Sequence, residues 1–163
     1  MIFITVGTHE QPFDRLISYV DRLVEEGKIR EKVFAQTGYC RYRPRNFAWK
    51  EFLPFEEIIA SIKASSVVIT HGGPASIMLA LAHGRVPVVV PRQRRYGEHV
   101  DDHQVVFAKK LREVGRAVAV MEMDELLQAI EKARSLSASM EMDLEEKARK
   151  FAERLDALCR ELL

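Results

Sequence analysis

The sequence contains little cysteine and no long apolar run, and each absence excludes a class of protein. Its two cysteines, Cys40 and Cys159, are too far apart for the CxxC pairs of a zinc or redox site. We expect both thiols to be reduced, as in a cytoplasmic protein, and assign them no role. No segment reaches the roughly 18 apolar residues of a membrane span, and residues 1–7 lack the basic start of a signal peptide. A secreted or integral membrane protein is therefore not expected.

The sequence also lacks an excess of charge of either sign. Its 25 Lys and Arg residues nearly balance 24 Asp and Glu residues, so the formal net charge is +1. No overall field attracts nucleic acid or a membrane surface, and any electrostatic recognition must be local. We expect no nucleic-acid partner. A length of 163 residues predicts a single domain over residues 1–163.

Two common nucleotide-binding motifs are missing, but one glycine-containing turn is present. Neither GxxxxGK[ST] nor GxGxxG occurs, which argues against a P-loop nucleotidase and a dinucleotide dehydrogenase. Residues 67–70 instead predict a buried strand that ends at His71-Gly72-Gly73, and Pro74 then begins a helix. Free N–H groups and the dipole at such a helix start favour a phosphate or diphosphate. A Gly-Gly turn before a helix is also common as a simple connection, so both interpretations stay open.

Apolar periodicity predicts strands that alternate with helices along the chain. Alternation of this kind indicates an α/β protein with a doubly wound parallel sheet. Strands are expected at residues 2–6, 33–37, 47–52, 67–70, 86–90 and 116–121, and helices follow Pro12, Pro54, Pro74, Asp101 or Asp102, and Asp124. The helix after Pro74 is apolar nearly all round, which places it inside the fold. A separate C-terminal helix at about 141–162 carries an apolar seam, which either packs across the chain's own sheet, as we favour, or docks a partner.

Several polar loops allow either a functional or a structural interpretation. The basic loop at residues 39–45 grips phosphate or is simply solvated, and we favour the latter. Among the arginines after the strand at residues 86–90, Arg92 is the best candidate for a phosphate. His99 and His103, with Asp101 and Asp102 between them, have a spacing that suits a divalent cation. We expect no metal there, because helix capping already explains the aspartates.

Ordered motifs along residues 1–120 resemble those of a known enzyme family. They are Val6-Gly7-Thr8, residues 70–76, Val89-Val90-Pro91-Arg92 and residues 97–104. Together they resemble the C-terminal domain of glycosyltransferase family 28, most closely in the bacterial exopolysaccharide branch, where the donor-binding half is a separate polypeptide. That branch is similar to the catalytic subunit of the eukaryotic dolichol-linked N-acetylglucosaminyltransferase. The resemblance implies a Rossmann-like doubly wound parallel sheet, the C-terminal half of a GT-B enzyme, and a UDP-sugar donor.

The resemblance also implies which residues contact the donor. It makes His71 the catalytic residue, and GT-B enzymes as a class generally need no bound metal. The implied donor-binding residues are Gly7, Thr8, Gln36, Gly38, Phe52, Gly72, Gly73, Pro74, Ala75, Ser76, Arg92, Glu98, His99, Asp101, Asp102, His103 and Gln104. In one place the chain departs from the family, since Leu79 stands where many members carry a ribose-binding glutamate. Ribose recognition is then expected to shift to Glu98 or Asp101, or to become less selective, and uracil is expected near residues 52–55.

Two functions from different classes follow from the resemblance. One is the catalytic subunit of a two-chain glycosyltransferase, which moves a sugar from UDP-sugar to a lipid-linked acceptor in polysaccharide biosynthesis. The other is a non-catalytic UDP-sugar-binding or enhancer subunit. A nucleotide-sugar epimerase is a further alternative within enzymes. We expect no cofactor besides the UDP-sugar substrate, a membrane-associated acceptor-binding partner subunit that keeps the chain at the inner face of the membrane, and possible homo-oligomers in isolation.

Overall fold

Six parallel strands form one sheet in the computed structural model, in the order β3-β2-β1-β4-β5-β6. The structure describes the backbone of residues 1–162 and the side chains of residues 1–154 and 157. The strands are β1 (Ile2–Thr5), β2 (Val33–Gln36), β3 (Ala48–Lys50), β4 (Val67–Thr70), β5 (Val88–Val89) and β6 (Val118–Ala119). All six lie within the ranges expected from the sequence, although β3, β5 and β6 are shorter.

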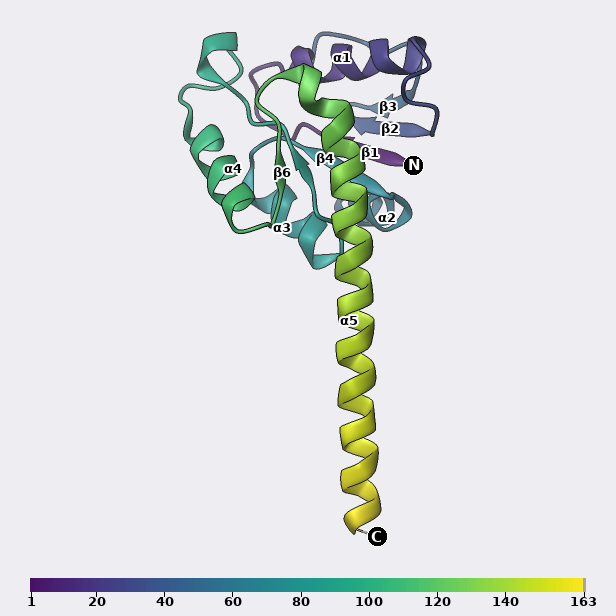
Figure 1. Cartoon of the computed structure of the whole chain (residues 1–163). Helices are drawn as coiled ribbons and strands as arrows, with labels where there is room; N and C mark the ends of the chain where they lie inside the picture. Colours follow the sequence, from purple (N-terminus) through teal and green to yellow (C-terminus); the bar gives the residue numbers. More distant parts are fainter. Residues whose placement is uncertain (163) are drawn as a thin grey trace.

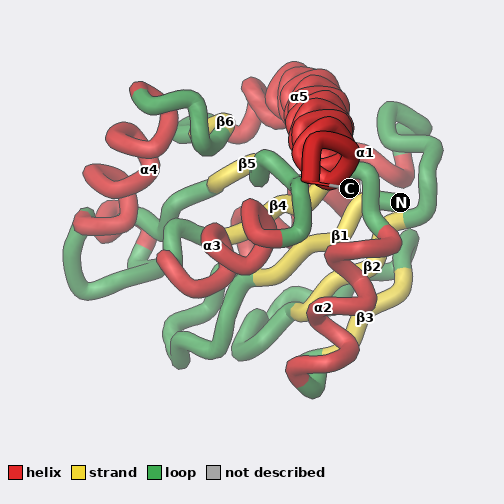
Figure 2. Tube along the Cα trace, turned by 90° about the horizontal axis from the view of Figure 1, so that it is seen from below, coloured by secondary structure: helices red, strands yellow, loops and turns green. Residues whose placement is uncertain are grey.

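Helices cover both faces of this sheet (Figure 2). They are α1 (Asp14–Glu25), α2 (Phe55–Ala64), α3 (Pro74–Ala82), α4 (His103–Glu113) and α5 (Leu126–Leu162), with 3-10 turns at η1 (Arg94–Tyr96) and η2 (Met123–Glu125). One face packs against α1 and the start of α5, and the opposite face packs against α2, α3 and α4. The doubly wound Rossmann-like fold is therefore confirmed.

The two central strands, β1 and β4, supply the middle of the core. Successive side chains of a strand point to opposite faces, so Ile2 and Ile4 pack beside α1 and α5 while Phe3 packs beside α2 and α3. Ile4 pairs in register with Ile69, and neither side chain is exposed. Burial of each such side chain stabilises the fold by about 1.5–3 kcal/mol. A rigid pair of strands therefore carries the two loops that follow Thr5 and Thr70.

The C-terminal helix differs from the expectation in length and in packing. Instead of two helices separated near residue 134, one helix of 37 residues runs from Leu126 to Leu162. Residues 134–140 contain neither glycine nor proline, so nothing breaks the helix, and three serines there are tolerated. Its start packs on the sheet through Leu126, Ile130 and Ala133, but every described side chain from residue 141 onward is exposed. The prediction that the tail crosses the sheet is wrong, and α5 projects away from it (Figure 1).

The helix after the Gly-Gly turn is less enclosed than its composition suggests. Only Ile77 and Ala80 of α3 are buried, whereas 58% of Met78 is exposed. The apolar composition predicted a helix that is buried all round, and this is wrong because α3 lies on one face of the sheet with its outer side uncovered. No helix within residues 1–162 combines the length and the apolar character that a membrane span requires.

Candidate functional site

The candidate site lies at the carboxyl ends of β1 and β4. From β1 the chain adds strands toward one edge of the sheet, and from β4 it adds them toward the other edge. In open α/β sheets, ligands bind beyond the carboxyl ends of the strands at such a switch. The loop after β1 contains Gly7, and the loop after β4 begins with His71. The two loops are in close contact, since a Cβ atom on Gly7 would lie 2.6 Å from Cε1 of His71. Gly7 also has a φ of 74°, so both its conformation and its packing require glycine.

A cavity of about 320 Å³ opens beside these two loops. Its polar wall comes from the ends of β1, β2 and β4 and from the start of α3, whereas its apolar wall comes from α2 and α3. The lining residues are Thr5, Gly7, Thr8, Gln36, His71, Ala75 and Ser76 with Phe55, Ile58, Ile62 and Leu79. The structure thus brings six of the expected donor-site residues to one cavity. A polar end beside an apolar end suits a ligand that combines charged groups with a ring.

The Gly72-Gly73 turn begins α3 as the sequence predicts, but the glycines are needed for another reason. Gly73 occupies the N-cap position with φ −76° and ψ 127°, which any residue can adopt, and Pro74 follows. A Cβ atom on Gly73 would lie 2.2 Å from Nε2 of His71, and one on Gly72 would lie 2.6 Å from Cβ of Gln104. Contacts within the protein therefore exclude larger residues. No side chain caps the start of α3, so its dipole and free N–H groups are available to an anion.

His71 is buried between these loops and is neutral at pH 7. Burial is the main cause that lowers its pKa to about 4, and the charges of Arg92, His9 and His99 lower it further. A backbone hydrogen bond with Thr5 acts in the opposite direction. The Nδ1 atom lies 3.4 Å from Thr70 Oγ1. A neutral imidazole has one N–H, for which the Thr5 carbonyl and an anion compete, so His71 hydrogen-bonds an anion only in the tautomer whose N–H faces the cavity.

Because the pKa of His71 is depressed, we expect a defined loss of stability in mild acid. Unfolded chains take up a proton on this histidine below about pH 6.5, whereas the folded chain resists protonation until about pH 4. The stability gained from neutral His71 is complete above pH 6.5 and is lost as the pH falls toward 4. The His71→Gln variant should lack this loss. The unfolding free energy of the wild type, minus that of the variant, should therefore fall by about 2–3 kcal/mol between pH 7.5 and pH 4.5.

Urea unfolding at both pH values measures this difference directly. Comparison with the variant cancels the effect of carboxylates that also titrate in acid. Asp21 is one of them. Burial raises its pKa, but hydrogen bonds from Asn46, Arg45 and Tyr42 outweigh burial, so its pKa is lowered. A difference that does not change with pH would show that His71 titrates normally in the folded protein.

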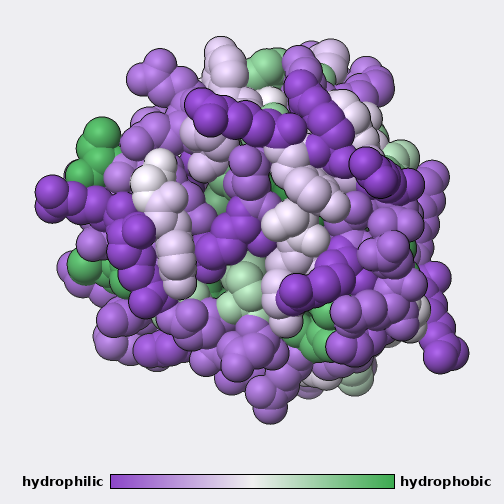
Figure 3. All heavy atoms as spheres, turned by 90° about the horizontal axis from the view of Figure 1, so that it is seen from above, coloured by the Kyte–Doolittle hydropathy of each residue, from purple (hydrophilic) through white to green (hydrophobic). Residues whose placement is uncertain are grey.

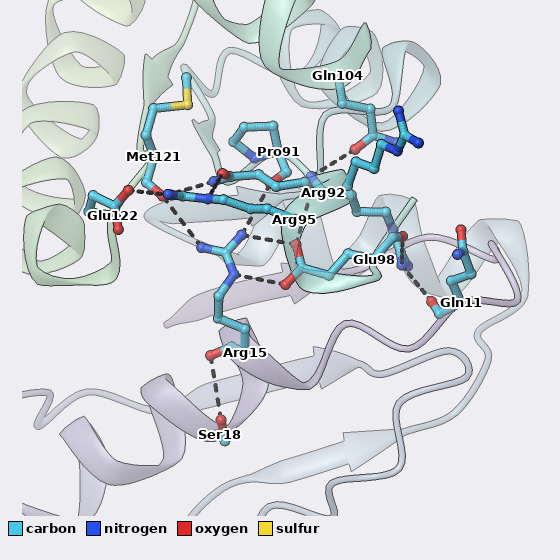
Figure 4. Close-up of polar contacts among 12 residues, drawn as sticks. Gln11, Arg15, Ser18, Pro91, Arg92, Arg95, Glu98, Gln104, Met121 and Glu122 are labelled. Atoms are coloured by element: carbon cyan, nitrogen blue, oxygen red, sulfur yellow. Dashed lines mark hydrogen bonds and ion pairs between the residues drawn. The ribbon is translucent and has the colours of Figure 1, made fainter. Parts of the chain in front are cut away.

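Arg92 does not face the cavity, so the expectation that it binds a phosphate is contradicted. The side chain is fully buried, and it donates to the carbonyls of Gln11 at 2.6 Å, Val6 at 2.8 Å and Glu98 at 3.2 Å. Its guanidinium also lies over the ring of Phe13, 5.0 Å from the centroid. Burial lowers the pKa of Arg92, but the three carbonyls stabilise its charge, and Figure 4 shows Arg92 beside Gln11 and Glu98. Arg92 thus joins the β1 loop to the β5 loop.

Glu98 and Gln104 are committed to the same buried network, and neither points at a ligand. Glu98 receives two hydrogen bonds from Arg15, at 2.8 and 3.1 Å, and one from the Gln93 backbone N–H (Figure 4). Gln104 Oε1 accepts from the backbone N–H groups of Gly72 and Arg92. The expectation that Glu98 recognises ribose is therefore wrong. Gln104 instead holds the Gly72 turn in place, which is a positioning role that the sequence did not reveal.

Replacement of Arg92 by methionine is expected to destabilise the fold, because three buried carbonyls would lose their donor. We expect a loss of about 3 kcal/mol or more. Arg94 provides a matched control, since it is exposed and Arg94→Met should change stability by less than about 0.5 kcal/mol. Urea unfolding compares the two variants. An Arg92→Met protein of normal stability that has lost UDP affinity would restore the ligand-binding interpretation.

Of the donor-binding residues expected in β2 and the segment after it, Gln36 lines the cavity, whereas Gly38 and Phe52 lie outside its lining. Gln36 lines the cavity, and its Oε1 accepts from Leu53 N–H at 3.1 Å. Gly38 packs against the β1 loop, because a Cβ atom there would lie 2.6 Å from the Gly7 oxygen. Phe52 lies outside the lining, edge-on to Tyr39 at 5.2 Å, and Phe55 lines the cavity in its place. Phe55 thus lines the cavity while Phe52 does not, and the expectation that uracil lies near residues 52–55 stays a prediction.

The histidines and aspartates before α4 lie outside the cavity lining. Asp102 occupies the N-cap position of α4, but its carboxylate accepts from Arg94 N–H, whereas Asp101 accepts from His103 N–H at 3.1 Å. His9, which was not among the expected site residues, stacks on His99 with ring centroids 4.7 Å apart. No local pattern indicates this contact, because the two histidines lie 90 positions apart in the sequence. Asp101 is exposed, and no described contact directs it to the cavity for ribose.

Cys40 has no role in this site. Its thiol is buried, and burial is the main cause that raises its pKa to about 11, so it is not a nucleophile at neutral pH. The side chain of Cys159 lies outside the described residues.

Comparison with known proteins agrees with this architecture. The family model described as the glycosyltransferase family 28 C-terminal domain matches residues 1–158. The chain is similar to the solved glycotransferase of kitacinnamycin, with 18% identity, a TM-score of 0.60 and coverage of 94% of this chain and 42% of that one. It is also similar to MurG of Acinetobacter baumannii, with 22% identity, a TM-score of 0.57 and coverage of 84% and 43%. The chain thus spans less than half the length of these enzymes. No curated protein matches the sequence.

Proposed function

The chain belongs to the family of glycosyltransferase family 28 C-terminal domains, and from this membership we propose that it is the donor-binding catalytic subunit of a two-chain glycosyltransferase. The donor is a UDP-sugar, and the acceptor is a lipid-linked sugar in polysaccharide biosynthesis. The observation that carries this proposal is the neutral imidazole of His71 beside the uncapped start of α3, at the edge of a cavity between β1 and β4. An anion bound there would accept hydrogen bonds from the N–H groups at the start of α3, and no carboxylate of the cavity lining would repel it.

The cavity suggests how UDP would lie. Its diphosphate would sit against the N–H groups at the start of α3, where Ser76 supplies a hydroxyl at the edge of the cavity. The uracil would lie toward the apolar wall of Phe55, Ile58 and Leu79. Leu79 offers no hydrogen bond to ribose, so ribose recognition would depend on groups outside this wall. We expect lower selectivity between UDP and dUDP than a carboxylate at this position would give.

During transfer, negative charge grows on the leaving diphosphate. The α3 dipole, its N–H groups and His71 would stabilise that charge without reorganisation, which is the effect that dominates many enzymes. The bond between the anomeric carbon and the diphosphate oxygen would break, UDP would leave with the electron pair, and the acceptor oxygen would bond to the anomeric carbon. The acceptor proton would pass to a base that the partner or the acceptor pocket supplies. No residue of this chain is assigned as that base.

A partner is needed to complete the enzyme. The chain spans 42–43% of its structural relatives, and orientation of the acceptor and exclusion of water would require a second domain. The exposed half of α5 is the surface we propose for the membrane-associated partner subunit, through Leu144, Ala148 and Phe151. That partner would hold the chain at the inner face of the membrane. Without it, the same apolar residues would favour homo-oligomers.

In the non-catalytic alternative, an enhancer subunit, the chain would bind a UDP-sugar in the same cavity but would not catalyse its transfer. Calorimetry with UDP, UDP-sugars, ADP and inorganic diphosphate tests the donor assignment on the chain alone. We expect UDP to bind and ADP to bind more weakly, with little sugar transfer until the partner is added. Efficient transfer by the purified chain alone would contradict the two-chain proposal, and failure of UDP to bind would remove the donor assignment itself.

A further inference from the structure

Three side chains with metal-ligand chemistry converge on the loop that leads into α4. His99, Asp101 and His103 each offer one atom, and these three atoms lie within 4.8 Å of one another. Within the part of the chain that the structure describes, no other group of His, Cys, Asp or Glu residues meets this condition. The sequence shows only alternate spacing over five residues. Convergence of the ligand atoms is a property of the folded loop.

The geometry of the group is close to that of a metal site. Asp101 Oδ1 lies 3.3 Å from His99 Nδ1 and hydrogen-bonds His103 Nδ1. In a tetrahedral site with bonds of about 2.0–2.2 Å, ligand atoms are about 3.3–3.5 Å apart. The two imidazole rings are nearly perpendicular, with an interplanar angle of 77° and centroids 4.8 Å apart. All three atoms lie within 4.8 Å of one another, and rotation of the exposed Asp101 and His103 side chains would let them share one ion.

The surroundings restrain the three ligands. His9 stacks on His99 with an interplanar angle of 22° and limits the movement of that ring, whose side chain is 12% exposed. The backbone N–H of His103 donates to Asp101 Oδ1 at 3.1 Å, which holds the carboxylate beside the two rings. Metals bind neutral imidazole and ionised carboxylate, so an ion would take the place of the proton that Asp101 and His103 share in their hydrogen bond.

We infer that His99, Asp101 and His103 form a binding site for a divalent transition-metal ion of the class that prefers imidazole nitrogen, such as Zn²⁺ or Co²⁺. Two nitrogens and one oxygen suit these ions better than Mg²⁺ or Ca²⁺, which prefer oxygen ligands. Asp101 and His103 are more than half exposed, which gives an ion a path to the site. Three protein ligands leave further coordination positions open to water or to an oxygen of a bound molecule. This proposal replaces the expectation, from the sequence, that helix capping alone explains these residues.

A direct test uses the untagged full chain without nucleotide. On titration with Co²⁺, the visible absorption should rise until one ion is bound per chain. Calorimetry with Zn²⁺ should also give one ion per chain, and EDTA should abolish this binding. His103→Ala and Asp101→Asn should each weaken binding by at least roughly 100-fold, since loss of even a residue that only supports a ligand costs about 10–100-fold. His103 and Asp101 are exposed, so both variants should fold, which circular dichroism without metal verifies.

Matched controls lie in the same chain. Asp102→Asn makes the same chemical change one residue from Asp101, but the Asp102 carboxylate accepts from Arg94 N–H and is not in the cluster. His83→Ala removes a histidine whose Nδ1 is paired with the Leu79 carbonyl. Both controls should bind Co²⁺ as the wild type does. Absence of a one-to-one complex, or equal loss in Asp101→Asn and Asp102→Asn, would overturn the site. Because no nucleotide is present, the outcome is independent of the proposed transferase function.

Discussion

Replacement of Gly73 by valine is expected to weaken UDP binding at least roughly 100-fold, equivalent to about 2.7 kcal/mol, while unfolding remains cooperative. The backbone at Gly73, with φ −76° and ψ 127°, accepts valine without strain. The new Cβ atom, however, would lie 2.2 Å from Nε2 of His71, so the valine or the displaced imidazole would fill the space at the start of α3 that the diphosphate needs. Calorimetry with UDP measures the affinity, and urea unfolding verifies the fold. Unchanged affinity would show that UDP does not bind at this turn.

A second variant shows whether displacement of His71 is the cause. Gly73→Val combined with His71→Ala removes the ring that the new side chain meets. If displacement of the ring accounts for the loss, the double variant should bind UDP as His71→Ala does, so the two substitutions are strongly non-additive. If valine blocks the ligand itself, the double variant should bind no better than Gly73→Val. Either result identifies what glycine does at this position.

The other large effect is expected for His71→Ala in the complex with the partner subunit. If His71 stabilises the diphosphate as its bond to the sugar breaks, it contributes more in the transition state than in the bound donor. Turnover should then fall by roughly 100-fold or more, with only a small change in the affinity for UDP-sugar. Because the neutral ring is the donor, with a pKa near 4 in the free chain, this loss should persist at pH 8. Steady-state kinetics at varied concentrations of UDP-sugar separate turnover from the affinity for the donor.

A sensor subunit would give the opposite kinetic pattern. The substitution would then weaken donor binding, and turnover would recover at saturating UDP-sugar. If neither turnover nor affinity changes, His71 only fills the space between Gly7 and Gly73, and its catalytic assignment is wrong. Ser76→Ala, at the same helix start, is a useful companion variant because it removes one hydroxyl without changing the packing of the two loops.

The sequence predicts those features that depend on neighbours along the chain. Val67–Thr70 is β4 and Pro74 begins α3, because a buried strand and a proline-led helix each have a local signature. The meeting of the Gly7 and His71 loops was also foreseeable, since carboxyl ends of parallel strands share one edge. The family resemblance named the site residues, and six of them, Gly7, Thr8, Gln36, His71, Ala75 and Ser76, line the cavity at that edge.

Features that depend on distant segments were not predictable. An arginine after a strand usually faces solvent, and nothing local shows that Arg92 lies beneath carbonyls from Val6, Gln11 and Glu98. The Arg15–Glu98 pair and the stack of His9 on His99 also join residues more than 80 positions apart. The length of α5 was missed for another reason, because a helix that leaves its domain needs no cap where the packing ends.

The face opposite the projecting end of α5 is mainly polar, with hydrophobic atoms only in separate patches (Figure 3). The projecting end itself has little tertiary support, since every described side chain from residue 141 onward is exposed and its ion pair with the domain is that of Glu141 with Arg85. Its helical conformation depends on local ion pairs four residues apart, Asp143 with Lys147, Glu146 with Lys150 and Arg149 with Glu153. Each such pair contributes about 0.3–0.5 kcal/mol and is screened by salt.

One continuous helix therefore contains two thermodynamic units. Its start opens only when the sheet unfolds, because Leu126, Ile130 and Ala133 are part of the core. Residues 142–154 open by themselves, so their amide protons are expected to exchange with solvent far faster, although the hydrogen-bond ladder of the helix is uninterrupted. A second subunit that packs along this stretch would slow that exchange and extend the cooperative unit beyond the sheet. Exchange rates along α5 thus report where the stability of the chain alone ends and the stability of an assembly begins.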